Sequence, residues 1–160
     1  MAARMRIGDV FEVALGNGQV GYFQYVAVDM SQLQSAVIRA FARLYDEGNR
    51  PDLAAIVADK VSFHAHVLLK SGYTLKIWHK VGNAPAPTEI DVLFRDSGDY
   101  GNPEIKISKD WYVWRINEPF RHVGALTPEY QSAEIGVVMP PQAIAARMLT
   151  GRYKFVYPGY

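Results

Sequence analysis

Three histidines carry the nitrogen ligands from which a metal site could be built. His64 and His66 are separated by one residue, so on a strand both imidazoles would point to one face, because side chains alternate with a period of two. His79, on the next predicted strand, would be a third ligand for zinc. The sequence shows neither a fourth ligand nor outer groups that would orient the rings. We therefore expect no metal and no cofactor, and we interpret the histidines as solvent-facing or hydrogen-bonded side chains.

The residues from Gly16 to Gly21 spell the pattern G-x-G-x-x-G, which holds a pyrophosphate in dinucleotide-binding proteins. That chemistry needs a helix directly after the loop, because the first amides of the helix bind the phosphates. Here the residues from Tyr22 to Val26 favour a strand instead. A kinase loop does lie between strands, but an acid, Asp29, stands where its lysine is expected, and no H-R-D or D-F-G motif follows. We predict a tight hairpin turn around Asn17-Gly18.

Signatures of other enzyme chemistry are missing from the sequence. The chain has no cysteine, and neither the nucleophile pattern G-x-S-x-G nor the zinc-binding pattern H-E-x-x-H occurs. The adjacent carboxylates of Asp46 and Glu47 stand in turn sequence, which assigns them no acid or base role. We therefore predict no catalytic residues and a protein that is not an enzyme. The lack of cysteine also excludes disulfides and favours a reducing compartment.

The aromatic residues best suited to recognising a partner lie close together in the sequence. The segment from Asp110 to Arg115 contains Trp111, Tyr112 and Trp114. On a strand, Trp111 would take one face while Tyr112 and Trp114 share the other. One face could be core and the other a recognition surface, because tryptophan and tyrosine are favoured in binding hot spots. A strand buried on both faces explains the pattern equally well.

Acidic residues gather around one glycine-rich loop, at Asp91, Asp96, Asp99 and Glu104. They could form a patch that meets a basic partner surface. Their spacing departs from a calcium-binding loop, which needs oxygen ligands at alternate positions before a bidentate glutamate. A solvated loop is the plainer interpretation. If the chain binds a protein, the contact residues that we expect are Trp111, Tyr112, Trp114, Asp96, Asp99 and Glu104.

The overall composition is that of a folded domain without a strong charge. The 160 residues are 49% hydrophobic and 21% charged, with a net charge of +1, which fits one globular domain over residues 1–160. The near-neutral charge argues against nucleic acid as a partner. No apolar run is long enough to span a membrane, and the segment Met1 to Asp9 lacks the apolar stretch of a signal peptide. We expect a cytoplasmic protein.

Strands dominate the predicted elements. The clearest unit is a hairpin from Val10 to Asp29, and the segment from Ser35 to Tyr45 fits both helix and strand, of which we favour the strand. The other segments are a helix over 52–59, strands over 61–69, 73–81, 90–94, 104–108 and 111–116, a helix over 142–150 ended by Gly151, and a closing strand over 152–157. We predict an α+β fold: a strand-rich curved sheet or a small SH3-like barrel with two or three short helices.

The first half of the chain resembles the immunity protein 26 family. The residues from Arg6 to Val13, with Asn17-Gly18 and Gly21 to Tyr25 behind them, are similar to the family's G-D-x-F strand, turn and aromatic strand. Val37 to Phe41 stands where the family has a strand like I-R-V-F. The segment from Gly72-Tyr73 through Trp78 to Pro85 is similar to the family's W-x-x-I-G-N-x-P. The order and rough spacing of these segments also match.

The resemblance implies a bacterial antitoxin protein that binds a cognate polymorphic toxin domain and blocks it by occlusion, without catalytic residues. It identifies neither the activity of the toxin nor an oligomeric state. An alternative is a small β-barrel that binds a ligand or nucleic acid, with bases stacked on Tyr22, Tyr25, Trp111 and Trp114. A third hypothesis is a metal-dependent hydrolase built on His64, His66 and His79.

Overall fold

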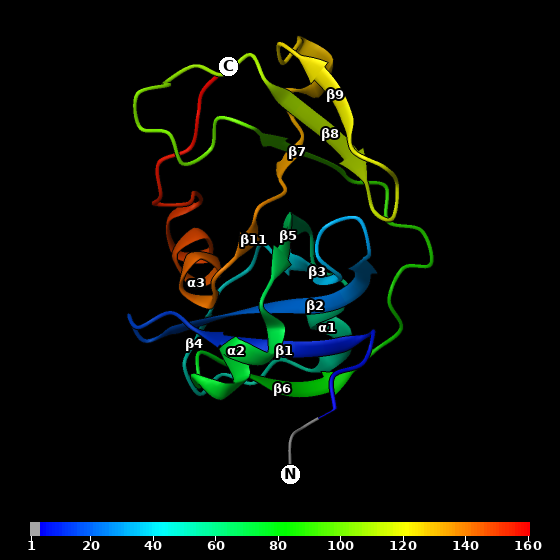
Figure 1. Ribbon diagram of the computed structural model, residues 1–160. Coiled ribbons are helices and arrows are strands. Elements are labelled where there is room, and N and C mark those ends of the chain that lie inside the picture. Colours follow the sequence, from blue (N-terminus) through cyan, green and yellow to red (C-terminus); the bar gives the residue numbers. More distant parts are fainter. Residues whose placement is uncertain (1–3) are drawn as a thin grey trace.

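Strands are the main regular elements of the protein, whose computed structural model describes residues 4–160 (Figure 1). The strands are β1 (Asp9–Ala14), β2 (Gln19–Asp29), β3 (Ser35–Phe41), β4 (Tyr45–Asp46), β5 (Val61–Val67), β6 (Trp78–Asn83), β7 (Leu93–Ser97), β8 (Trp111–Arg115), β9 (Arg121–Gly124), β10 (Glu134–Ile135) and β11 (Val138–Met139). The α-helices are α1 (Leu53–Val57), α2 (Leu69–Thr74) and α3 (Pro141–Thr150), with a 3₁₀ turn, η1, at Pro128–Tyr130.

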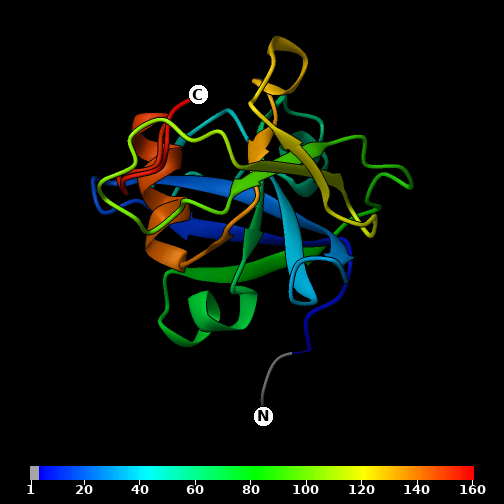
Figure 2. The same cartoon turned by 45° about the horizontal axis from the view of Figure 1, so that its top comes forward.

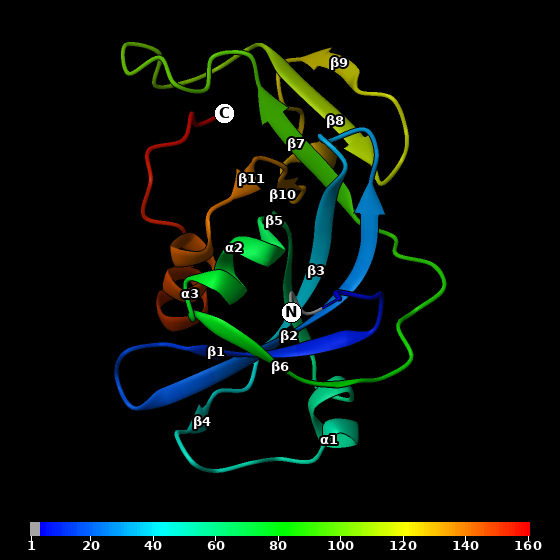
Figure 3. The same cartoon turned by 60° about the horizontal axis from the view of Figure 1, so that its bottom comes forward.

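These strands form two sheets. The larger has seven strands in the order β11-β5-β3-β2-β1-β6, with β4 paired to β2, and the smaller has four in the order β10-β7-β8-β9. The long strand β2 bends along its length (Figure 3), and its pairing with β3 shifts register partway along. Neither sheet closes into a barrel within the described residues. The α+β prediction is therefore confirmed, with open, curved sheets in place of the SH3-like barrel.

The predicted N-terminal hairpin is confirmed. β1 and β2 pair antiparallel, with Glu12 opposite Tyr22. The turn differs in detail, because the positive φ angles are at Gly16 (80°) and Gly18 (85°) and not at Asn17. Asn17 uses its side-chain oxygen to accept a backbone amide two residues later, at 3.0 Å. The G-x-G-x-x-G pattern is thus a hairpin loop that leads into a strand, as predicted.

The ambiguous segment is a strand in the middle of the larger sheet. β3 pairs antiparallel with β2 on one side and β5 on the other. Val37 and Ile38 point to opposite faces, and both are fully buried. A strand buried on both faces loses the apolar-polar alternation, which explains why the pattern was ambiguous. β3 ends at Phe41, so Arg43 and Leu44 lie beyond it.

Two predicted helices are confirmed, and each has a capping residue at one end. The Asp52 side chain accepts the Ala55 amide at 2.8 Å and so caps α1. Gly151 ends α3 in the left-handed conformation, with φ of 82°. The strands predicted over 61–69 and 111–116 form as β5 and β8, and the one predicted over 90–94 forms later along the chain, as β7.

The strand predicted from Tyr73 to Val81 is wrong in its first half. Helix α2 occupies the chain as far as Thr74, and β6 begins only at Trp78. The buried indole of Trp78 fills the space beside Gly72, where an added Cβ would lie 2.0 Å from the ring. The same indole donates its Nε1–H to the Leu69 carbonyl at 2.9 Å. This contact joins a helix to a later strand, so local periodicity could not reveal it.

Two strands predicted in the C-terminal half do not form. Residues 104–108 form a loop, and their backbone pairing is limited to one isolated β-bridge. Residues 152–157 alternate as predicted but pair with no strand of the described chain, residues 4–160. Their rings instead pack on one another, with centroids 5.3 and 6.1 Å apart between successive members of the series Tyr153, Phe155 and Tyr157. The alternation in the tail therefore reflects aromatic packing.

An apolar layer joins the two sheets. Phe94 and Trp114 of the smaller sheet pack with Val26 and Val37 of the larger one. On its other side the larger sheet is covered in part by α3, whose Ile144 is fully buried in the main core. Figure 2 shows α3 along one flank of the larger sheet, with β7, β8 and β9 across the top. The C-terminal third of the chain thus completes the core that the first strands begin.

The first three residues lie outside the described part of the chain. They belong to the Met1 to Asp9 segment, from which we predicted that no signal peptide is present. No helix within residues 4–160 is long and apolar enough to cross a membrane.

Candidate functional site

The two tryptophans predicted as partner contacts lie in the core. Trp111 is 0% exposed and Trp114 is 2% exposed. Trp111 packs with Val113 and Leu126 on one face of the smaller sheet, and its Nε1–H donates to the Ser108 carbonyl at 2.9 Å. The strand is therefore buried on both faces around the tryptophans, which was one of the two interpretations that the sequence left open. In this conformation neither indole can touch a partner.

The base-stacking surface of the nucleic-acid hypothesis does not form either. Stacking requires ring faces that are open to solvent. Of the four aromatics proposed for it, Tyr22, Trp111 and Trp114 are buried, and Tyr25 is only half-exposed. Trp114 instead packs between the two sheets, Trp111 packs on the other face of the smaller sheet, and Tyr22 packs beside α1.

Tyr112 is the member of the aromatic strand that reaches the surface. Its ring centroid lies 4.8 Å from that of His122 on β9. The His122 Nε2 is 2.7 Å from Asp110 Oδ1, and the two side chains are 54% and 45% exposed. These three residues form a half-exposed cluster that offers a partner an aromatic face and a polar edge.

The three acidic residues predicted as contacts have different environments. Asp96 is half-buried and accepts the Tyr157 hydroxyl at 2.9 Å, and burial raises the pKa of its carboxyl. Asp99 accepts the Ser108 hydroxyl at 2.7 Å and so braces the loop. Glu104 is exposed, and its carboxylate makes no hydrogen bond or ion pair within residues 4–160. Glu104 is therefore the acid that is best placed to meet a partner.

An apolar groove lies beside Glu104. It has a volume of about 270 Å³ and is lined by Gly101, Asn102, Pro103, Ile105, Val156 and Pro158. Val156, in its lining, is 86% exposed; Ile107 and Tyr160, each two residues along the chain from a lining residue, are 63% and 54% exposed. We call these lining and rim residues, with Glu104, the tail groove. Exposed apolar clusters with a charged edge are typical of protein-binding surfaces, and sequence reasoning found only the acidic part of this one.

Beneath the tryptophans, a buried carboxylate connects the two sheets. Asp29 is fully buried and accepts hydrogen bonds from His66 Nε2 at 2.8 Å and Trp114 Nε1 at 3.0 Å. Its other oxygen accepts the backbone amides of Ser31 and Asn117, both at 3.0 Å. Burial alone would raise the pKa of Asp29, but these hydrogen bonds outweigh it and hold the pKa below its usual value. Asp29 is therefore a structural anion.

His66 is neutral in this arrangement. Burial lowers the pKa of its imidazole, and the opposing attraction of Asp29 does not compensate. Because Asp29 is ionised, the proton must sit on His66 Nε2, which donates to it. The other ring nitrogen, Nδ1, is buried without a hydrogen-bond partner within residues 4–160. An Asp-His pair can serve in catalysis, but this one is fully enclosed and so cannot reach a substrate.

The three histidines considered for zinc are not brought together. His64 and His66 lie on β5, whereas His79 lies on β6, and β3, β2 and β1 separate those two strands in the sheet. The strand that follows β5 along the chain is therefore not its neighbour in the sheet, and His79 cannot serve as the third ligand considered. No three side chains of histidine, aspartate or glutamate within residues 4–160 cluster closely enough to hold a metal ion. His79 instead belongs to a different pocket.

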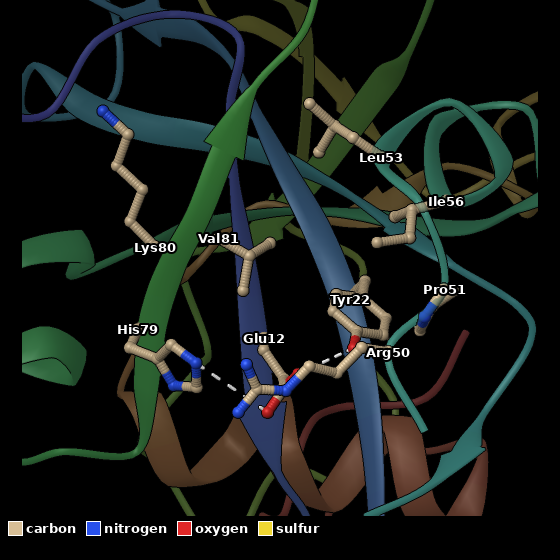
Figure 4. Close-up of a pocket in the computed structure, with 9 residues that line it drawn as sticks. All are labelled: Glu12, Tyr22, Arg50, Pro51, Leu53, Ile56, His79, Lys80 and Val81. Carbon is tan, nitrogen blue, oxygen red and sulfur yellow. Dashed lines mark hydrogen bonds and ion pairs between the residues drawn. The ribbon is translucent and has the colours of Figure 1, made fainter. Parts of the chain in front are cut away.

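That pocket lies where β1, β2 and β6 meet the segment around α1, and its volume is about 430 Å³ (Figure 4). Its walls are both polar and apolar, and its lining residues are Glu12, Tyr22, Arg50, Pro51, Leu53, Ile56, His79, Lys80 and Val81. In Figure 4 the side chains of Glu12, Tyr22, Arg50 and His79 converge at one end, and Lys80 points away. Lys80 pairs with Asp9, with 2.9 Å between Nζ and Oδ1.

Glu12 is the centre of the polar end. One of its oxygens accepts the Tyr22 hydroxyl at 2.7 Å, and the other lies 3.8 Å from His79 Nε2. Burial and the neighbouring carboxylate raise the pKa of Tyr22, so its hydroxyl stays protonated and donates. The arrangement can bind a polar group of a ligand or partner beside the apolar wall of Leu53 and Val81.

Sequence reasoning missed Glu12 and Arg50 as pocket residues. One signal for the first was available: a hairpin turn at residues 16–18 sets the register that places Glu12 opposite Tyr22. Nothing local predicts Arg50, because it reaches the strands from the loop before α1 (Figure 4).

Comparison with known proteins shows which family the chain belongs to. No curated protein and no solved structure matches the chain. A family model described as Immunity protein 26 matches residues 6–106, which is more than half of the chain. The match includes β1 to β7, the whole lining of the Glu12 pocket and the loop that carries Glu104. This chain belongs to the immunity protein 26 family.

Proposed function

We propose that this protein is a cytoplasmic, single-domain, non-enzymatic immunity protein, which binds a cognate bacterial polymorphic toxin and blocks it by occlusion. The observation that carries the proposal is the family match over residues 6–106. An immunity protein needs a surface that fits its toxin, so the remaining question is which surface of this fold provides it.

The tail groove is our candidate for the centre of that surface. Val156, Ile107 and Tyr160 supply exposed apolar area, and burial of such area drives association. Glu104 supplies a charge at the edge, where charged groups guide the encounter with a partner. Two of the other residues predicted from the sequence, Asp96 and Asp99, hold the loop in shape from within.

Tyr112 with His122 and Asp110 is a second candidate contact at the same end of the smaller sheet. The chain leaves β7 at Ser97, passes through the Glu104 loop and returns at Trp111 to start β8. Trp111 and Trp114 contribute indirectly, because they fix β8 and therefore the position of Tyr112.

The function is tested by co-expression in bacteria with the toxin domain encoded beside this gene. The intact chain should restore growth, and the purified proteins should form a one-to-one complex. Growth inhibition that persists at full expression of the folded protein would reject the proposal.

The surface is tested by Val156→Asp, which places a charge in the apolar patch without disturbing the core. We expect the substitution to weaken toxin binding by a factor of about ten or more, as is usual for a central interface residue. Leu33→Asp is the matched control, because Leu33 is 83% exposed, close to the 86% of Val156, and lies on the turn between β2 and β3. Equal weakening by both variants would argue against the tail groove.

A further inference from the structure

A pocket with three arginines lies where the smaller sheet meets the end of α3. Its volume is about 250 Å³, and its lining residues are Arg95, Ser132, Ala133, Glu134, Ile135, Arg147, Gly151, Arg152 and Tyr153. Three arginines and one glutamate are among these residues, which leaves an excess of two positive charges around the pocket. Except for Arg95, the lining lies outside the part of the chain that matches the family model.

One arginine is already paired. Arg147 donates to Glu134 at 3.0 Å, and both side chains are largely buried. Its guanidinium also lies over the rings of Phe63 and Tyr153, 4.1 and 4.7 Å from their centroids. A cation at the last turn of α3 is favourable because it faces the negative end of the helix dipole. Arg147 and Glu134 therefore form a fixed wall of the pocket.

Arg95 is held in place but has no anionic partner in the part of the chain that the structure describes. Its Nε donates to the Ala133 carbonyl at 3.0 Å, and its terminal nitrogens make no hydrogen bond or ion pair within residues 4–160. The guanidinium is packed between aromatic rings, 5.3 Å from the centroids of Trp111 and Tyr160 and 5.9 Å from that of Tyr157. Such packing fixes the orientation of the guanidinium before any ligand arrives.

Two further groups around the pocket lack partners among the described residues. The Arg152 side chain is exposed and makes no ion pair there. The Tyr153 hydroxyl is buried without a hydrogen-bond partner, and a buried hydroxyl of this kind is costly unless something accepts from it. An oxyanion in the pocket could accept hydrogen bonds from Arg95 and Arg152, and its negative charge would offset the positive excess.

We propose that this pocket binds an oxyanion, with Arg95 and Arg152 as the principal donors. A planar guanidinium fits two oxygens of a carboxylate or a phosphate equally well. The ligand is therefore either the carboxylate of an acidic side chain or a free phosphate. The site goes beyond the proposed function, because small anions can occupy it whether or not a toxin binds elsewhere.

The test is an NMR titration of the full ¹⁵N-labelled chain with inorganic phosphate and, separately, with N-acetyl-aspartate. We expect saturable shifts of the Arg95 Nε–H signal and of the Gly151 and Arg152 amides with at least one of them. Sodium chloride at the same ionic strength should give no saturable shift. Stronger binding of phosphate identifies the free anion as the ligand, and stronger binding of N-acetyl-aspartate identifies an acidic side chain.

Arg152→Gln keeps the exposed side chain and removes its charge, so the fold should be unaffected. Loss of one charge-assisted hydrogen bond should weaken anion binding by a factor of about ten. Arg95→Met retains the apolar stem and should abolish saturation. Arg43→Gln, which removes an exposed arginine stacked on Tyr45 near β4, is the control and should bind as the parent does. Shifts that match those with chloride, or equal affinity in Arg152→Gln and the parent, would overturn the proposal.

Discussion

The Asp29 carboxylate lies 2.8 Å from His66 Nε2, and both side chains are completely buried between the two sheets. Asp29 ends β2 and His66 lies on β5, while Trp114, which donates to the same oxygen, belongs to the smaller sheet. The carboxylate is therefore the polar link across an apolar interface. Removing the carboxylate would leave the donors around it without an acceptor, and each unsatisfied buried group costs about 1–3 kcal/mol.

We predict that Asp29→Ala lowers the free energy of unfolding by about 3–5 kcal/mol, because four donors lose their acceptor, two of them inside the core. Urea denaturation followed by tryptophan fluorescence measures the change. The control is Glu89→Ala, which alters an exposed carboxylate and should leave stability within about 0.5 kcal/mol of the parent. A loss of less than about 1 kcal/mol in Asp29→Ala would show that Asp29 is not the link described.

His64 and His66 should make the protein less stable in acid. Burial, with the neighbouring charge of Arg39, lowers the pKa of His64 to about 4, and burial also lowers the pKa of His66. Between pH 6.5 and pH 4 these imidazoles are therefore protonated in the unfolded chain but remain largely neutral in the folded chain. The free energy of unfolding falls as the pH falls, because the unfolded chain binds more protons.

For His64 alone the loss between pH 7 and pH 4 is on the order of 2 kcal/mol. His64→Gln should flatten the dependence of the unfolding free energy on pH by about this amount. Denaturant curves at several pH values measure it, with His122→Gln as the control at a half-exposed histidine. Identical slopes for His64→Gln and the parent would contradict the prediction.

Gly72→Ala should destabilise the protein although alanine is the better helix former. In an exposed helix the change would stabilise by about 1 kcal/mol. Here the new Cβ would lie 2.0 Å from the Trp78 ring, and overpacking of this kind costs about 1–3 kcal/mol. Thermal unfolding measures the balance, and Ser71→Ala, one position earlier in α2, is the control. A Tm above that of the parent would mean that the indole can move aside.

Trp111→Ala and Tyr112→Ala, adjacent on β8, should have opposite profiles. The first removes a fully buried indole and should cost about 3–5 kcal/mol of stability. The second should cost about 1 kcal/mol, as a half-exposed residue does, and should instead weaken toxin binding. Chemical denaturation and calorimetric titration with the toxin domain separate the two effects. Comparable loss of stability in both variants would show that Tyr112 is also a core residue.

Several features were determined by the sequence alone. The hairpin of β1 and β2, the Asp52 cap of α1 and the Gly151 end of α3 depend on residues that are close together in the chain. Backbone φ preferences and short-range hydrogen bonds act within such segments whatever surrounds them. The family resemblance in the first half was likewise readable, because it rests on short segments in a fixed order.

Other features were decided only by the tertiary structure. The aromatic alternation at Trp111 to Trp114 fits an exposed or a buried face equally well. Packing of the smaller sheet on the larger one buries Trp114, while Leu126 and Tyr157 cover Trp111 on the other face. The tail over 152–157 alternates like a strand, yet no strand among the described residues pairs with it. Tertiary contacts can override local propensity in this way because they involve partners far along the chain.

The candidate sites show the same division. Glu104 was found from its loop composition, and Glu12 could have been found from the hairpin register. Arg95 lies on β7, whereas Arg147 and Arg152 lie at the end of α3 and just after it, and each is an ordinary arginine when taken in its own surroundings. Only the packing of α3 against the edge of the smaller sheet brings them together, since the distance between side chains is set by the fold and not by their separation in sequence.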